Sequence, residues 1–241
     1  MALVFAIAPS LLILAFVSLA DRSPKRFGAL ILAIVAGAFA IVPVHGFVEF
    51  HAIAITNVWL ETYPVALYRS FVFAALPEEL SKFVLLWSLF HVCRPVREPI
   101  HGLVYGTAIA LGFASVESLA SLEGASLQVL ASRATTTIPC HAALGMIMGD
   151  YLGQAELAPP GARAGLRARA LIFPILLHGM YDAPLLLLRG LGEQASVVET
   201  RVILVYVYVL LTGMIVHALW RLHRLRSMQR DASPSGRLPG E

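Results

Sequence analysis

Long, continuously apolar stretches limit what this chain can fold into more than any other feature of its sequence. There are seven of them, at residues 2–20, 27–47, 65–92, 99–121, 134–153, 170–189 and 200–221. Each is close to or above the ~20 residues that a helix needs to cross the hydrocarbon core of a bilayer. None alternates apolar and polar residues, as the strands of a membrane barrel do. The sequence therefore predicts an all-α, polytopic transmembrane helical bundle of about seven spans.

The overall composition supports the same class of protein. Of the 241 residues, 58% are hydrophobic and only 14% are charged, and the mean hydropathy is +0.77. An ordinary soluble domain carries about 25% charged residues, so this chain could not cover a soluble core with polar surface. The same numbers exclude intrinsic disorder, and two cysteines are too few for a disulfide-framed secreted module. We expect one transmembrane domain over residues 1–226 and a polar, disordered cytoplasmic tail over residues 227–241.

The distribution of basic residues predicts how the bundle is oriented. Thirteen of the 18 Lys and Arg residues lie in the first, third and fifth loops, or at the end of the last stretch and beyond it: Arg22, Lys25, Arg26, Arg94, Arg97, Arg163, Arg167, Arg169, Arg221, Arg224, Arg226, Arg230 and Arg237. The opposite side holds Arg69, Arg133, Arg189 and Arg201. Because cytoplasmic loops are rich in Lys and Arg, we expect the N-terminus outside and the C-terminus in the cytoplasm. Residues 45–64 are compatible with an outer loop, a surface helix or a re-entrant segment.

Besides Arg69 near its start, the third apolar stretch contains three charged residues close together, Glu78, Glu79 and Lys82. Ionisable side chains at membrane depth are costly, and by default they mark a functional site. Lys82 follows the two glutamates by four and three residues, so all three can share one helix face. One lysine balances one carboxylate, and two adjacent carboxylates in a low dielectric cannot both be ionised cheaply. The extra glutamate therefore favours acid–base chemistry over a purely structural ion pair, which is the alternative interpretation.

Four more ligand-type side chains occur in the following stretches. His178 and Asp182 are four residues apart on one helix, and Glu117 and His141 lie in the two preceding stretches. At ~1.5 Å rise per residue, the predicted topology brings all of these groups to one level in the outer half of the bilayer. A histidine with a carboxylate one turn away is typical of a metal ligand or of an imidazole oriented by that carboxylate.

Glycines recur in the fourth and fifth stretches at spacings that let membrane helices approach closely. They are Gly102, Gly106, Gly112, Gly145, Gly149 and Gly153. Close packing of these two stretches would bring Glu117 near His141.

In order along the chain, these residues resemble four motifs of the PrsW family of bacterial intramembrane metalloproteases. The Glu-Glu-x-x-Lys motif is intact at residues 78–82, and the His-Gly-x-Tyr-Asp motif is intact at residues 178–182. Residues 112–118 resemble the Gly-Phe-Ala-x-x-Glu-Asn motif, with Ser118 in place of Asn, and residues 139–142 resemble a His-Ala element. The wider clan includes the CAAX-prenyl and bacteriocin-processing proteases.

The resemblance implies a membrane-embedded peptidase of a bacterial plasma membrane that cuts a membrane-anchored protein near the outer face. An anti-sigma factor is one candidate substrate, the lipid bilayer is the other partner, and no nucleic-acid partner is expected. A divalent metal, with zinc as the first candidate, would activate water and polarise the scissile carbonyl. On this interpretation His141 and His178 are the nitrogen ligands, and Asp182 or Glu117 is the carboxylate ligand or an orienting partner.

The catalytic roles then fall to the third stretch, where Glu78 or Glu79 is the base and Lys82 neutralises the other. A metal-free mechanism, in which a glutamate and a histidine activate water, remains open at this point. The competing function is a proton- or ion-coupled transporter, because a carboxylate and histidine relay has a similar pattern. Many transporters contain inverted repeats, whereas this sequence shows no internal repeat. A catalytically silent scaffold would not need so many acidic groups at membrane depth.

Overall fold

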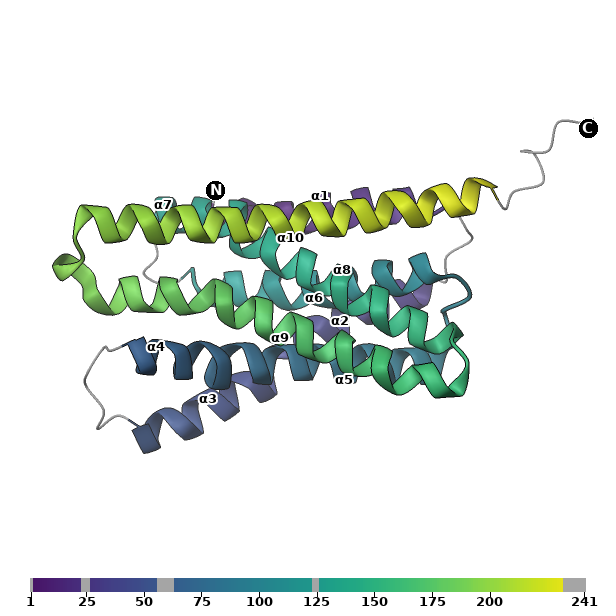
Figure 1. Ribbon diagram of the computed structural model, residues 1–241, viewed down its shortest axis with the longest axis horizontal. Helices are drawn as coiled ribbons and strands as arrows, with labels where there is room; N and C mark the ends of the chain where they lie inside the picture. Colours follow the sequence, from purple (N-terminus) through teal and green to yellow (C-terminus); the bar gives the residue numbers. More distant parts are fainter. Residues whose placement is uncertain (1, 23–26, 56–62, 123–125, 232–241) are drawn as a thin grey trace, which may run out of the picture.

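The computed structural model describes residues 2–22, 27–55, 63–122 and 126–231, and these residues form an all-α bundle (Figure 1). The long helices run roughly along one common axis, as expected for a polytopic membrane protein. In chain order the elements are α1 (Ala2–Ala20), α2 (Phe27–Phe39), α3 (Ile41–Ile55), α4 (Tyr63–Tyr68), the π-helix η1 (Arg69–Ala75), α5 (Leu76–Cys93), α6 (Pro99–Ala120), α7 (Leu127–Thr135), α8 (Thr137–Leu157), α9 (Pro160–Leu191), the 3-10 helix η2 (Gly192–Gln194) and α10 (Val197–Asp231).

Five described helical stretches are long and apolar enough to cross a membrane. They are Leu3–Ala20, Phe27–Val48, Pro99–Ala120, Pro160–Gln194 and Val197–Asp231. The two other stretches that were expected to span are also helical, over α4–η1–α5 and over α8. They fall short of that criterion because α5 carries three charged residues and because polar residues lower the mean hydropathy of α8. The count of seven spans therefore stays a prediction.

The most extensive contact between helices joins α6 to α8. Glycines from both helices line this contact: Gly102 and Gly106 on α6, and Gly145, Gly149 and Gly153 on α8. A Cβ atom on Gly106 would overlap the carbonyl of Gly145 and would lie 2.8 Å from the Cα of Gly149. The close approach that the glycine spacing predicts is therefore confirmed, and it holds the two buried helices of the site in register.

The helix that leads into α5 widens into a π-helix, η1. The backbone N–H of Leu76 bonds to the carbonyl of Phe71, five residues earlier, instead of the usual four. Pro77 follows in the first turn of α5. A proline cannot donate to the carbonyl four residues before it, and its ring crowds that carbonyl, so the preceding turn is free to widen. The helix is thus distorted in the turn that comes just before Pro77.

One end of the bundle is tied together by Gln229, near the end of α10. Its amide nitrogen donates to Asp21, after α1, at 2.9 Å and to Glu98, before α6, at 2.7 Å. Its amide oxygen accepts a hydrogen bond from the backbone N–H of Arg22 at 3.2 Å. The first loop, the third loop and the end of α10 therefore lie at the same end of the bundle. That shared end is where the charge distribution places the cytoplasm, and the orientation itself stays a prediction.

The boundary expected at residue 226 is wrong. Helix α10 continues to Asp231, so residues 227–231 are helical and are not part of a disordered tail. The reason is that the apolar face of α10 extends through Leu222 and Leu225, which are both buried, and Gln229 anchors the last turn. Residues 232–241, the rest of the expected tail, lie outside the described residues.

The segment at 45–64 is helical as far as Ile55, in α3, and residues 56–62 lie outside the described residues. Three of the basic residues used to orient the bundle, Lys25, Arg26 and Arg237, also lie outside them.

Candidate active site

The charged side chains that the sequence places at one depth meet in the middle of the bundle. They come from α5, α6, α8 and α9, and one continuous network of contacts joins all seven: Glu78, Glu79, Lys82, Glu117, His141, His178 and Asp182. The structure thus brings together every residue that was predicted for the site, although their roles are not equivalent.

Glu79 is the most deeply buried carboxylate of the network, with none of its side chain exposed. Its Oε1 atom accepts a hydrogen bond from Lys82 Nζ at 2.7 Å and lies 2.8 Å from Nδ1 of His178. Its Oε2 atom is buried and has no hydrogen-bond partner among the described residues. One oxygen of Glu79 is therefore saturated, and the other is available to a cation or to a donor from outside the chain.

Lys82 lies next to four other groups of the site, and its side chain is only 1% exposed. Besides Glu79, its Nζ atom contacts Glu78 Oε2 at 3.3 Å and His141 Nδ1 at 3.1 Å. It also lies 4.2 Å from the ring centre of Phe113, which is close enough for a cation–π interaction. A cation so enclosed is stabilised only by these neighbours, so Lys82 holds the glutamates and His141 in fixed positions.

Each histidine has a carboxylate behind it. Nε2 of His141 lies 3.0 Å from Glu117 Oε2, and Nε2 of His178 lies 3.2 Å from Asp182 Oδ2. The two imidazole rings stand edge to face, with their centres 5.2 Å apart. In both histidines the Nε2 atom faces the carboxylate and the Nδ1 atom faces the centre of the network. Such carboxylate–histidine pairs fix the ring orientation of metal-binding imidazoles.

A cavity of about 460 Å³ opens next to the network. Its wall includes Glu78, Glu117, Arg133, His141, His178 and Asp182, whereas Glu79 and Lys82 lie behind this wall. The side chain of Glu78 is 13% exposed, in contrast to the sealed Glu79. Of the two motif glutamates, only Glu78 can therefore meet a water molecule or a peptide in the cavity.

The donor atoms that come closest together differ from the metal-ligand set expected from the sequence. Ligand atoms of Glu78, Glu79, His141 and His178 all lie within 4.8 Å of one another, among the described residues. Glu117 and Asp182, which the sequence interpretation allowed as ligands, lie on the outer Nε2 side of the two rings. Two imidazole nitrogens with carboxylate oxygens are a donor set that suits zinc and similar divalent ions.

Sequence reasoning missed Arg133 as a member of the site. Its Nη2 atom lies 2.8 Å from Glu117 Oε1, so Glu117 bridges Arg133 and His141. The sequence contributed Arg133 only to the charge count of the outer side. Its position in the sequence could have suggested it as a site residue, because it ends the short segment that joins the stretch with Glu117 to the stretch with His141.

A sequence profile described as PrsW family intramembrane metalloprotease matches residues 25–214 of this chain. The chain belongs to the PrsW family. Protease PrsW of Oceanobacillus iheyensis is 27% identical over 204 residues, which cover 85% of this chain and 90% of that protein. Protease PrsW of Halalkalibacterium halodurans is 30% identical over 183 residues, 76% of this chain and 82% of that protein.

Protease PrsW of Bacillus subtilis is 38% identical over a shorter region of 107 residues, which spans 44% of this chain and 49% of that protein. No solved structure is significantly similar to this chain. Membership of the PrsW family makes the chain a bacterial integral membrane protein and an intramembrane protease, a hydrolase whose substrate is a membrane protein. The transporter interpretation is not favoured. The family is one of metalloproteases, and the cluster of glutamate and histidine donors fits a metal ion.

Proposed function

We propose that the chain hydrolyses a membrane-anchored protein at the cavity beside Glu78, in the outer half of a bacterial plasma membrane. One observation carries the assignment of the base. Glu78 lines the cavity, whereas Glu79 is sealed behind it and has one oxygen engaged by Lys82 and His178. A general base must reach the proton that it removes, so Glu78 is the base and Glu79 is a ligand or positioning group.

In this mechanism Glu78 accepts a proton from the water molecule as the water oxygen bonds to the scissile carbonyl carbon. Glu78 then passes that proton to the amide nitrogen as the carbon–nitrogen bond breaks, which yields a free carboxyl end and a free amino end. Lys82 stabilises the negative charge of Glu78 from 3.3 Å away and fixes the carboxylate against the cavity wall. Arg133 keeps Glu117 in place behind His141.

We propose zinc as the metal, held by His141, His178 and Glu79. The support is the chemistry of these donors: both rings are oriented from behind by carboxylates, and Glu79 Oε2 is buried without a partner among the described residues. When bound, the metal would polarise the scissile carbonyl and make the water a better nucleophile. Glu117 and Asp182 act through the histidines that they orient.

Quantitative proteomics identifies the substrate and tests the reaction together. Membrane-protein fragments are compared in cells that produce the wild-type chain, Glu78→Gln or Glu156→Gln. Glu156 is the matched control, because it is a half-buried glutamate that pairs with Arg167 away from the cavity. We expect one or a few fragments with wild type and Glu156→Gln and none with Glu78→Gln. An anti-sigma factor is the regulatory substrate that we propose to find.

The purified proteins then separate the remaining alternatives. Cleavage of the identified substrate should fall by ~100-fold or more in Glu78→Gln at normal abundance of the folded protein. Metal content should be close to one ion per wild-type chain and should be lost in His141→Ala/His178→Ala. Activity that survives strong chelators, with equal and near-zero metal in both proteins, would select the metal-free mechanism. Normal cleavage by Glu78→Gln would refute the assignment of Glu78 as the base.

A further inference from the structure

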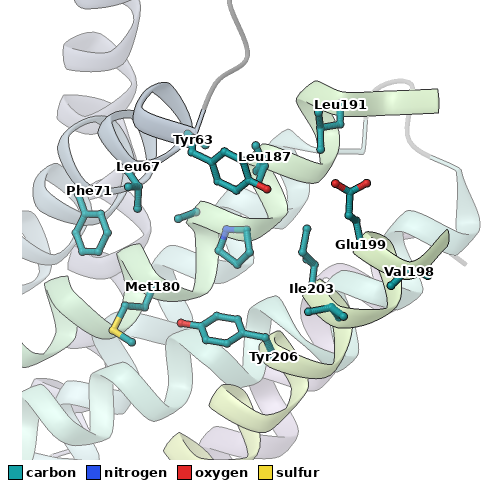
Figure 2. Close-up of a pocket in the computed structure, with 14 residues that line it drawn as sticks. Tyr63, Leu67, Phe71, Met180, Leu187, Leu191, Val198, Glu199, Ile203 and Tyr206 are labelled. Atoms are coloured by element: carbon teal, nitrogen blue, oxygen red, sulfur yellow. The ribbon is translucent and has the colours of Figure 1, made fainter. Parts of the chain in front are cut away.

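A second cavity, of about 620 Å³, lies on the other side of α9, between α4–η1, α9 and α10 (Figure 2). We call it the lateral groove. Figure 2 shows the rings of Tyr63, Phe71 and Tyr206 and the side chains of Met180 and Leu187 around the same space. Helix α9 separates this groove from the catalytic cavity, because Met180 and Leu187 line the groove while neighbouring Asp182 lines the cavity.

We propose that the lateral groove is the docking site for the transmembrane helix of the protein substrate. This inference rests on the proposed proteolytic function and adds the place where the substrate is held before cleavage. The partner has a defined chemistry: an apolar helix embedded in the bilayer, with a segment that unwinds next to the catalytic cavity.

The position of the groove supports this partner. Two of its walls belong to elements linked to the catalytic groups: η1 continues into α5, which carries Glu78, and α9 carries His178. Along α9 the groove extends from Leu191 to Met180, about 16 Å at ~1.5 Å per residue, and so ends at the level of His178. A helix lying in the groove would therefore be guided to the depth of the catalytic network.

Phe71 and Gly179 connect the inner end of the groove to the site. The Phe71 side chain packs so closely against α9 that a Cβ atom on Gly179 would overlap its ring. Gly179 is the residue that follows His178. A substrate helix in the groove would thus contact Phe71, whose ring packs directly against Gly179, the residue next to His178 on α9.

Pro184 lies inside α9, and both Pro184 and Met180 line the groove. Because proline has no N–H, the carbonyl of Met180 has no donor four residues later in the helix. A peptide segment carries N–H groups that can bond to such a carbonyl, whereas an acyl chain carries none. This difference in chemistry is our reason for proposing a protein partner over a phospholipid tail.

The outer end of the groove coincides with the start of α10. The Ser196 hydroxyl accepts a hydrogen bond from the backbone N–H of Glu199, and the Glu199 carboxylate accepts one from the N–H of Ser196. This reciprocal cap is typical of a helix start in a polar environment, and Glu199 lies at the rim of the groove. The groove therefore begins at the predicted outer surface and runs inward, as a docking site for a membrane-anchored protein must.

Two valines on α10 offer a matched test. Val202 lines the groove and Val205 does not, although both side chains are 63% exposed on the same helix. Val202→Trp and Val205→Trp are assayed with two probes in lipid vesicles. The first probe is a membrane protein with one transmembrane helix, whose fragment is found only in cells that produce active enzyme. The second probe is a soluble peptide that contains the cleavage sequence of that protein and lacks its transmembrane helix.

We expect Val202→Trp to raise KM for the single-span protein by about tenfold, as loss of one central interface contact does, and to leave cleavage of the peptide unchanged. Val205→Trp should leave both reactions unchanged. Equal effects of the two substitutions, no effect of Val202→Trp, or a parallel loss of peptide cleavage would overturn the docking site. Failure of the wild-type chain to cut either probe would refute the proposed function instead.

A photo-crosslinking residue at Val202 gives an independent measurement. With saturating single-span protein, it should form an adduct with the span of that protein, and the same residue at Val205 should not. Adducts with phospholipid alone at Val202, under the same conditions, would show that the groove holds an acyl chain and would overturn the proposal.

Discussion

Replacing Lys82 by methionine should destabilise the whole protein, because its ammonium group is the main positive charge that compensates Glu79. The two groups are 2.7 Å apart, and their side chains are 1% and 0% exposed. Methionine keeps most of the volume and leaves a buried carboxylate without its cation. Breaking a buried pair from one side typically costs about 3–5 kcal/mol, and we expect the free energy of unfolding to fall by that amount.

The double variant Lys82→Met/Glu79→Gln distinguishes this explanation from simple loss of packing. Lys82→Met leaves the charge of the Glu79 carboxylate uncompensated, and Glu79→Gln removes that charge. The double variant should therefore be more stable than the sum of the two single effects predicts. We expect a coupling free energy of about 2–3 kcal/mol between the two positions. The assay is reversible unfolding of the purified chain in lipid bicelles by a denaturing detergent, followed by circular dichroism.

Glu156 and Arg167 form the control pair for this cycle. They are 3.3 Å apart, but their side chains are 22% and 31% exposed, so water screens their attraction. The same cycle at this pair should give less than about 1 kcal/mol. A coupling free energy for Lys82 and Glu79 that is no larger than this control would refute the view that the buried charge network holds the site together.

Three further predictions concern the frame around the site. Gly106→Leu should separate α6 from α8 and abolish both folded yield and cleavage, because even a Cβ atom at this position would overlap the α8 backbone. Asp150→Asn should lower the free energy of unfolding by about 1–3 kcal/mol, because Asp150 accepts two hydrogen bonds from Arg221, at 2.6 and 2.7 Å. Reporter fusions after Arg26 and after Gln194 should report opposite compartments, with the first in the cytoplasm.

Each of these three has an internal check. Gly165 on α9 has open space around it, so Gly165→Leu should be tolerated where Gly106→Leu is not. Arg221→Met should destabilise at least as much as Asp150→Asn, since it leaves the buried carboxylate of Asp150 unpaired. Two fusions that report the same compartment would contradict the predicted topology.

The meeting of the site residues at one level of the bundle was predictable because helix rise is constant. Counting residues from the ends of the apolar stretches placed Glu79, His141 and His178 at one depth, and in the structure these three residues are connected through short contacts. The glycine spacing also predicted which helices touch. Both predictions depend only on backbone geometry, which the sequence pattern reports directly.

The direction in which neighbouring side chains point about the helix axis was not predictable in the same way. Glu78 and Glu79 are equivalent in the sequence, and only the packing of α5 against α9 shows that the first faces the cavity and the second is sealed. Arg133 was missed because it lies on the short helix α7, just outside the apolar stretches that were searched for buried charges. The end of α10 was misplaced because charged residues such as Arg230 lower the hydropathy of a helix that continues regardless.

The widened turn of η1 sets the angular phase between the two halves of one continuous helix. Tyr63 and Leu67, before the turn, look onto the lateral groove, and Glu78, after it, looks onto the catalytic cavity. In a regular helix each residue advances the direction of its side chain by about 100°, so deleting one residue from η1 would swing the first half away from the second by that angle. The number of residues between Leu67 and Glu78 therefore sets the angle between their side chains about the helix axis. With the present number, Leu67 faces the lateral groove on one side of α9 and Glu78 faces the catalytic cavity on the other side.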